Sequence, residues 1–146
     1  MALYTFQAGS TTYAIGFIWQ SGHGRATTLA RQSSRAVGYD VYCAIPVPNG
    51  TSTQIGLSQA GMHLRRIKRT TSLAAALALT GNSLHAVVTL DKSRSYHCAI
   101  RAGEVLAAGD VVGSATNIDV IEQEHNEMVG LDQATHYSLQ EFLTLV

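Results

Sequence analysis

The sequence predicts a mixed α/β layer fold, with helices packed on a sheet, and three observations support this. Strand-like and helix-like periodicities alternate along the chain, as they do in α+β and mixed α/β layers. The N-terminal segment has bulky side chains on one face and small ones on the other. Apolar residues make up 46% of the 146 residues and charged residues only 14%, which favours a packed core over disorder. We therefore expect one domain over residues 1–146.

A β-hairpin is the first element that we expect. Its strands cover residues 3–7 and 13–20, and Ala8-Gly9-Ser10 forms the turn. Period-2 alternation in the second strand places aromatic and large aliphatic side chains on one face and smaller ones, including Gly16, on the other. Because a helix can approach closely over a strand glycine, this strand should be internal to a sheet.

Two helices and one strand are expected in the middle of the chain. Apolar residues at i, i+3 and i+4 predict a helix over residues 25–37. A strand over 39–45 should stop at Pro46, which cannot donate to a sheet ladder. Residues 46–70 predict no regular element. A second helix over 73–79 has Ser72 or Thr71 as its N-cap and ends before Gly81.

The C-terminal half predicts two strands, a short third one, and two helices. The strands cover 85–90 and 95–101 and are joined by the polar loop 91–94, followed by a short strand at 105–106 and a turn at 109–114. The helices cover 118–129 and 139–146. The first is amphipathic, with one stripe formed by Ile118, Ile121, His125 and Met128. Ser138 and Glu141 form the sequence signature of a capping box at the start of the last helix.

Charge and cysteine content exclude several classes of protein. Ten basic residues balance ten acidic ones, so the chain has no overall field for nucleic acid or a membrane surface. Cys43 and Cys98 lie in apolar, strand-like stretches and are expected to be buried, reduced thiols. No signal peptide and no apolar run of about 18 residues is present. These features indicate a cytosolic domain.

No constellation of residues predicts catalysis, a cofactor or a metal. None of the six histidines pairs with another at the i, i+4 spacing of a helical metal site, although His85 and His97 could face each other across their hairpin. Neither a nucleophile elbow nor a P-loop is present. The set formed by Glu122, Glu124, His125 and Glu127 is interpreted as a solvated helix face. We expect a protein that is not an enzyme.

One local concentration of charge is a candidate for binding a partner. It consists of Arg65, Arg66, Lys68 and Arg69. Such a segment could dock an acidic protein or contact acidic lipid headgroups. The alternative interpretation is a solvated loop without a partner.

Parts of the sequence resemble the PilO family of pilin accessory proteins, which help to assemble type IVb pili. The resemblance is carried by aromatic, glycine and small residues in five short stretches: residues 4–9, 13–20, 72–77, 96–103 and 109–110. It reaches most of the chain up to about residue 115, and none of its motifs transfers a catalytic residue.

This resemblance implies the N-terminal cytoplasmic part of a bitopic inner-membrane protein, ending before its membrane-spanning helix. It also implies an actin-like (ribonuclease H-like) fold, similar to domains that recruit the assembly ATPase. The expected role is a scaffold at the cytoplasmic side of the bacterial inner membrane. It would dock other pilus assembly proteins and could form a homo-oligomer, with no nucleic-acid partner.

The alternative function is a nucleotide-binding or ATP-hydrolysing domain. Its candidate phosphate loops are the turns at residues 8–11 and 109–114. In actin-like ATPases the first such turn carries an aspartate, whereas Gln7 and Ala8 stand near it here. The missing acid suggests that the fold is kept without ATPase chemistry.

Overall fold

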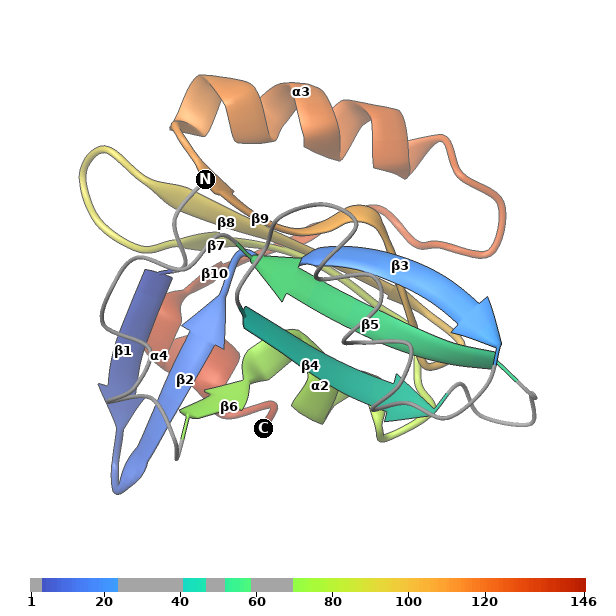
Figure 1. Ribbon diagram of the computed structural model, residues 1–146. Coiled ribbons are helices and arrows are strands. Elements are labelled where there is room, and N and C mark those ends of the chain that lie inside the picture. The colour runs from blue at the N-terminus through green and yellow to red at the C-terminus, as the bar shows by residue number, and fades with distance from the viewer. Residues whose placement is uncertain (1–3, 24–40, 47–51, 59–69) are drawn as a thin grey trace.

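The computed structural model describes residues 4–23, 41–46, 52–58 and 70–146, which form three sheets and three helices (Figure 1). This is a mixed α+β fold, as the sequence predicts, whereas the narrower actin-like assignment stays a prediction. The strands are β1 (Tyr4–Ala8), β2 (Thr11–Ile15), β3 (Ile18–His23), β4 (Val41–Pro46), β5 (Ser52–Ser58), β6 (Thr70–Ser72), β7 (Leu84–Thr89), β8 (Ser95–Arg101), β9 (Glu104–Gly113) and β10 (Thr135–Ser138). The helices are α2 (Leu73–Ala78), α3 (Ala115–Asn126) and α4 (Leu139–Leu143).

The central sheet has the strand order β10-β7-β8-β9 and is covered by helices on both faces. Strands β7, β8 and β9 are antiparallel neighbours, while β10 runs parallel to β7. Helix α3 covers one face, and α2 and α4 lie on the other (Figure 1). The hairpin predicted from residues 85–101 is confirmed, with Ser95 opposite Thr89.

Strand β8 is buried on both faces, and its side chains alternate between two cores. Tyr96, Cys98 and Ile100 belong to the larger core. This core contains thirteen buried residues, among them residues of α2 and α4. Ala99, on the opposite face, packs with Leu106 and Leu131 in a much smaller apolar cluster. The sheet therefore has one strongly apolar face and one face where a smaller apolar cluster lies beside buried polar side chains.

The predicted strand over residues 13–20 is wrong, because the chain breaks at Gly16 and Phe17. Strand β2 pairs with β1 and β6, whereas β3 pairs with β5 in a separate sheet of order β3-β5-β4. Gly16 has a φ of +103°, a backbone conformation that glycine adopts without steric cost. The opening β1–β2 hairpin itself is confirmed, with Ala8 opposite Thr11.

The β3-β5-β4 sheet is attached to the central sheet through β9. The buried Gln54 side chain on β5 donates to the carbonyl of Val105 (2.8 Å) and accepts from its N–H (2.7 Å). The side-chain amide of Gln54 thus makes with Val105 the pair of hydrogen bonds that the backbone of a neighbouring strand would make. Strand β5 was not predicted, because it contains a glycine and polar residues and shows no period-2 alternation, residues 53–57 all being buried.

Other boundaries differ from the sequence prediction for local reasons. Residues 109–114 do not form a turn, since β9 continues to Gly113. Helix α3 begins at Ala115 because the Ser114 side chain caps it by accepting from Asn117 N, and it ends at Asn126 rather than at 129. The predicted caps Ser72 and Ser138 are confirmed, the latter in a capping box with Glu141, although α4 is shorter than predicted.

The predicted helix over 25–37 lies outside the described residues. Residues 46–70, for which no regular element was predicted, contain β5, and residues 47–51 and 59–69 lie outside the described ranges. None of the helices in the described ranges is long and apolar enough to cross a membrane.

Candidate functional site

A wide bulge in β9 organises the polar groups on both faces of the central sheet. Cys98 pairs with Asp110 and Ile100 pairs with Val105, so β8 advances by two positions while β9 advances by five. Within the bulge Ala108 has a φ of +55°, which is uncommon for a residue with a side chain. Gly109 is required there, because an added Cβ would clash with Ala99 O and lie 2.7 Å from Leu106 O. The bulge turns successive backbone carbonyls toward α3 and directs the next side chain to the opposite face.

On the side of the larger core, the carboxylate of Asp110 accepts four hydrogen bonds and is 2% exposed. Its Oδ1 accepts from Gly16 N (3.1 Å) and from the hydroxyl of Tyr96 (2.7 Å). Its Oδ2 accepts from Phe17 N (3.2 Å) and from Trp19 Nε1 (2.8 Å). We call this group the Asp110 centre. Since a carboxylate has about four acceptor positions, the donors of the chain itself use them all.

The charge state of the Asp110 centre follows from burial and from its donors. Burial raises the pKa of Asp110, and the hydrogen bonds from Trp19, Gly16, Tyr96 and Phe17 oppose that rise. Three of these four partners are N–H groups, which only donate, so they fit the ionised carboxylate. Burial and this negative charge raise the pKa of Tyr96 well above its usual value.

Cys98 lies beside this centre as a fully buried free thiol. Burial, reinforced by the charge of Asp110, raises its pKa to about 12. The thiol is therefore protonated at neutral pH and is a poor nucleophile. The prediction of a buried, reduced cysteine is confirmed for Cys98, while the Cys43 side chain lies outside the described part of the structure.

On the opposite face three buried histidines meet beneath α3, and we call them the histidine cluster: His85, His97 and His125. The ring centroids are separated by 5.0 Å (His85–His97), 4.6 Å (His97–His125) and 5.9 Å (His85–His125). The Nε2 atoms of His85 and His97 are 2.9 Å apart. The sequence predicted that these two could face each other. It placed His125 on the stripe of an amphipathic helix and also in an acidic set that was interpreted as solvated.

Backbone carbonyls contact the remaining ring nitrogens of the cluster. His85 Nδ1 lies 2.8 Å from Asp132 O, and His97 Nδ1 lies 2.7 Å from Ala108 O in the bulge. The two nitrogens of His125 contact Ile121 O and Ala107 O, both at 2.9 Å; Ala107 also belongs to the bulge. Burial lowers the pKa of His97 to about 4, and burial also lowers the pKa of His85.

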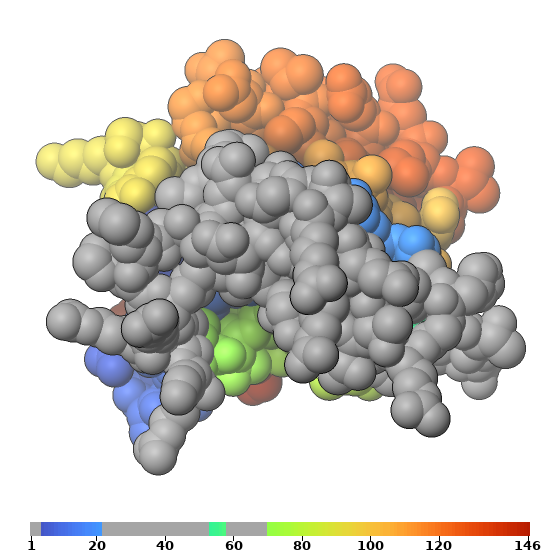
Figure 2. All heavy atoms as spheres, in the orientation of Figure 1, coloured from blue at the N-terminus to red at the C-terminus, as the bar shows by residue number. Residues whose placement is uncertain are grey.

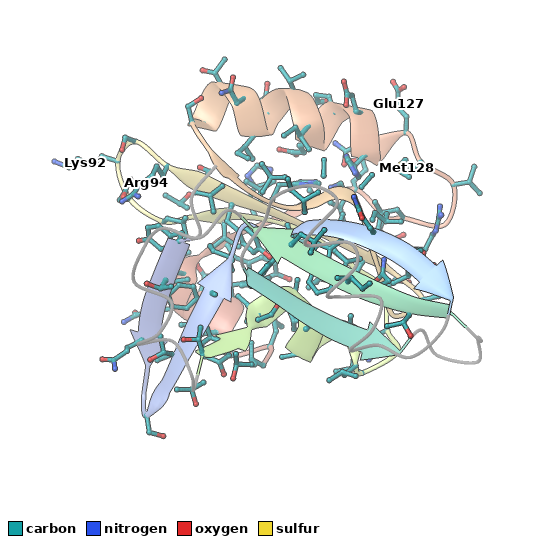
Figure 3. The ribbon with its side chains drawn as sticks, viewed as in Figure 1. Lys92, Arg94, Glu127 and Met128 are labelled. Atoms are coloured by element: carbon teal, nitrogen blue, oxygen red, sulfur yellow. The ribbon has the colours of Figure 1, made fainter. Side chains whose placement is uncertain are left out.

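Glu122 and His125 correct the prediction of a solvated acidic helix face. They lie three residues apart, which places them on one side of α3, and both are buried. Glu122 Oε2 is 2.9 Å from Nε2 of the exposed His136 on β10. Glu124 and Glu127 are exposed, as predicted; Glu127 points away from the sheet at the end of α3 (Figure 3).

The geometry indicates that these buried polar groups hold parts of the fold in place. Among the described residues, no group of three or more His, Cys, Asp or Glu side chains could hold a metal ion. Every buried side-chain nitrogen or oxygen in that part of the chain has a hydrogen-bond partner. The two buried clusters thus tie strands and helices together. The predicted binding residues Arg65, Arg66, Lys68 and Arg69 lie outside the described ranges, so the structure does not place them.

Comparison with known proteins gives a structural likeness without a sequence family. The fold is similar to the crystal structure of the cytoplasmic domain of BfpC, with a TM-score of 0.61 and 16% sequence identity. The match covers 94% of this chain and 83% of that one. No protein-family model matches the sequence, and no curated protein matches it. The resemblance to the PilO family therefore stays a prediction.

Proposed function

We propose that this chain is a docking module of a type IV pilus assembly machine. The observation that carries the proposal is the shared fold with the cytoplasmic domain of BfpC, a bundle-forming pilus assembly protein, over nearly the whole chain. The resemblance of residues 4–9 and 96–103 to the PilO family points to the same kind of machine. In this proposal the module acts at the cytoplasmic face of the inner membrane, as part of a longer protein.

The proposed role is structural and not enzymatic. The acceptor positions of the Asp110 carboxylate are used by its own chain, and burial keeps the Cys98 thiol protonated. Both groups therefore serve the fold in this proposal. Binding would use the surface, where the chain can contact other assembly proteins such as the assembly ATPase, or a second copy of itself.

The basic segment formed by Arg65, Arg66, Lys68 and Arg69 is the proposed docking surface. A comparison surface of opposite charge is offered by the outer side of α3, where Asp119, Glu124 and Glu127 are exposed. The atoms of α3 are visible along the upper rim of the molecule (Figure 2). Because the two surfaces carry opposite charge, reversing each one separately distinguishes specific docking from a general effect of net charge.

The experiment measures binding of the purified chain to purified type IVb pilus assembly proteins, including the assembly ATPase. One variant carries glutamate at Arg65, Arg66, Lys68 and Arg69. The matched control carries lysine at Asp119, Glu124 and Glu127. We expect the first variant to lose roughly tenfold or more in affinity, equivalent to about 1.4 kcal/mol, while the control keeps wild-type binding.

Three outcomes would contradict the proposal in different ways. No binding to any assembly component would refute the docking function. Unchanged binding of the folded glutamate variant would refute the choice of surface. A melting temperature that rises with Mg-ATP would favour the nucleotide-binding alternative, because a ligand at a hundred times its Kd stabilises a native protein by about 2.7 kcal/mol.

A further inference from the structure

The interface between α3 and the central sheet combines a small amount of apolar packing with several buried polar contacts. Its apolar part includes the cluster of Ala99, Leu106 and Leu131, with Met128 packed against them, and the buried Ile118 of α3, which lies against Gly113 of β9. The opposite face of the same sheet holds thirteen buried residues in one cluster. An element with little apolar burial opens at lower free energy than the main core. The attachment of α3 is therefore sensitive to the state of its polar partners.

Titratable and charged groups reach this interface from every element around it. They are His85 on β7, His97 and Arg101 on β8, His136 on β10, and Glu122 and His125 on α3. The exposed Asp119, Glu124 and Glu127 of α3 and the exposed Asp132 remain in solvent. Glu122 is the buried carboxylate among them, and it is paired with His136. The interface thus contains more groups that can become positive than groups that can compensate them.

The geometry of the His85–His97 pair limits how many protons it can hold. Both Nδ1 atoms face backbone carbonyls, at 2.8 Å and 2.7 Å, and a carbonyl only accepts hydrogen bonds. Each Nδ1 must therefore carry a hydrogen. The two Nε2 atoms are 2.9 Å apart, so a hydrogen bond between them has room for one hydrogen. Three hydrogens fit on the four nitrogens, which corresponds to a single positive charge.

A fourth hydrogen cannot be accommodated without movement. It would direct two N–H groups at each other and would place two positive rings in contact in a buried site. The ring of His125, in the last turn of α3, lies against this pair. Its centroid is 4.6 Å from that of His97, and both of its nitrogens face backbone carbonyls.

We propose that α3 is released from the central sheet by acid, when His85 and His97 are both protonated and their rings are forced apart. The larger core on the opposite face stays folded during this step. Burial lowers the pKa of His97 from 6.5 to about 4. Between these two pH values His97 is protonated in the unfolded chain but neutral in the folded chain. The stabilisation is present in full above about pH 6.5 and is lost as the pH falls toward about 4.

The test is hydrogen exchange of backbone amides in the whole chain at about pH 7 and about pH 4.5, corrected for the intrinsic pH dependence of exchange. We expect protection of α3 amides to fall roughly tenfold or more at the lower pH, while α2 and β8 keep theirs. In His97→Gln, which cannot acquire the charge, α3 protection should be the same at both pH values. His136→Gln is the matched control: it removes an exposed histidine of the same interface and should keep the acid response.

Three results would overturn the proposal. They are equal α3 protection at both pH values in the wild type, loss of α3 together with α2 and β8, and an unchanged acid response in folded His97→Gln. His85→Gln replaces His97→Gln if the latter does not fold. If neither variant folds, the wild-type measurement decides, together with imidazole ¹⁵N spectra that show whether both Nε2 atoms become protonated as α3 opens.

Discussion

The Asp110 centre and the histidine cluster lie on opposite faces of the central sheet and stabilise buried polar groups in different ways. At the Asp110 centre, four donors of the chain meet the acceptor positions of one carboxylate. In the histidine cluster, four ring nitrogens contact backbone carbonyls and two contact each other. At neutral pH every acceptor position of the Asp110 carboxylate has a donor, whereas the hydrogen bonds of the histidine cluster change with every proton that it gains or loses.

This difference shows that burial alone does not decide whether a polar cluster is fixed or responsive. Asp110 and His97 are 2% and 0% exposed, and they come from adjacent strands. What separates them is the match between donors and acceptors. A cluster whose donors match its acceptors holds its elements together at any moderate pH, whereas the elements joined by an unmatched cluster stay together only in one range of pH.

Replacing the carboxylate is expected to have the largest effect. Asp110→Asn keeps the shape but turns an NH₂ group toward two donors, so we expect a loss of about 3 to 5 kcal/mol in the free energy of unfolding. Urea denaturation followed by circular dichroism measures it. Asp119→Asn on the exposed side of α3 is the matched control and should change stability by less than about 0.5 kcal/mol. A loss as small as that of the control would mean that the donors do not need the charge.

Closing the bulge should damage both clusters at once. In Gly109→Ala the new Cβ clashes with backbone atoms of Ala99 and Leu106, so we expect a loss of about 2 to 3 kcal/mol. Gly113→Ala, on the same strand, places its Cβ in ordinary contact 3.6 Å from the Ile118 side chain and should be nearly neutral. Equal effects in the same denaturation assay would show that the bulge is not rigid.

The pH dependence of stability should separate the two clusters. Because burial lowers the pKa values of His85 and His97, we expect the wild type to lose about 2 kcal/mol between pH 6.5 and pH 4. Tyr96→Phe weakens the Asp110 centre and should keep this slope, whereas His97→Gln should flatten it. Parallel urea titrations at several pH values provide the measurement, and a steep slope in His97→Gln would assign the acid loss to other groups.

Removing one donor from the Asp110 centre should have the smallest effect of the series. Tyr96→Phe leaves the carboxylate with three hydrogen bonds, so we expect a loss of about 1.5 kcal/mol at neutral pH. Tyr137→Phe, a half-buried tyrosine that packs on Phe142, is the control and should be nearly neutral. A Tyr96→Phe loss equal to that of Asp110→Asn would mean that the hydroxyl, and not the charge, holds the centre together.

Local patterns predicted the elements of this fold better than its connections. The hairpin over residues 85–101 and the caps at Ser72 and Ser138 follow from alternation and from side-chain hydrogen bonds within a few residues. The break at Gly16 was missed because it depends on Asp110, a partner far away in the sequence. Strand β10 was missed because four residues carry too little periodicity, and its parallel partner β7 lies far from it in the sequence.

Dependence on partners far away in the sequence also explains which parts of the candidate site were missed. His85 and His97 were expected to approach each other, because hairpin register follows from a short loop. Glycine and aspartate at 109–110 predicted a turn, since the bulge that places them in a strand is stabilised by contacts on both faces of the sheet. Helical spacing placed His125 on the stripe with Ile118, but the acidic set around it was interpreted as solvated because Glu124 and Glu127 are charged. The i, i+4 spacing of Ile118 and Glu122 could have indicated that Glu122 lies on the buried side as well.

The clamp between Asp110 and the Gly16–Phe17 break also bears on the order of events during protein synthesis. The β1–β2 hairpin is synthesised before β9, and the carboxylate that fixes its connection to β3 follows Gly16 by 94 residues. Contacts between such distant residues form slowly, because a long loop must close first. The nascent N-terminal ribbon therefore stays unsecured until most of the chain has been translated, and during that interval its strand edges can pair with other chains.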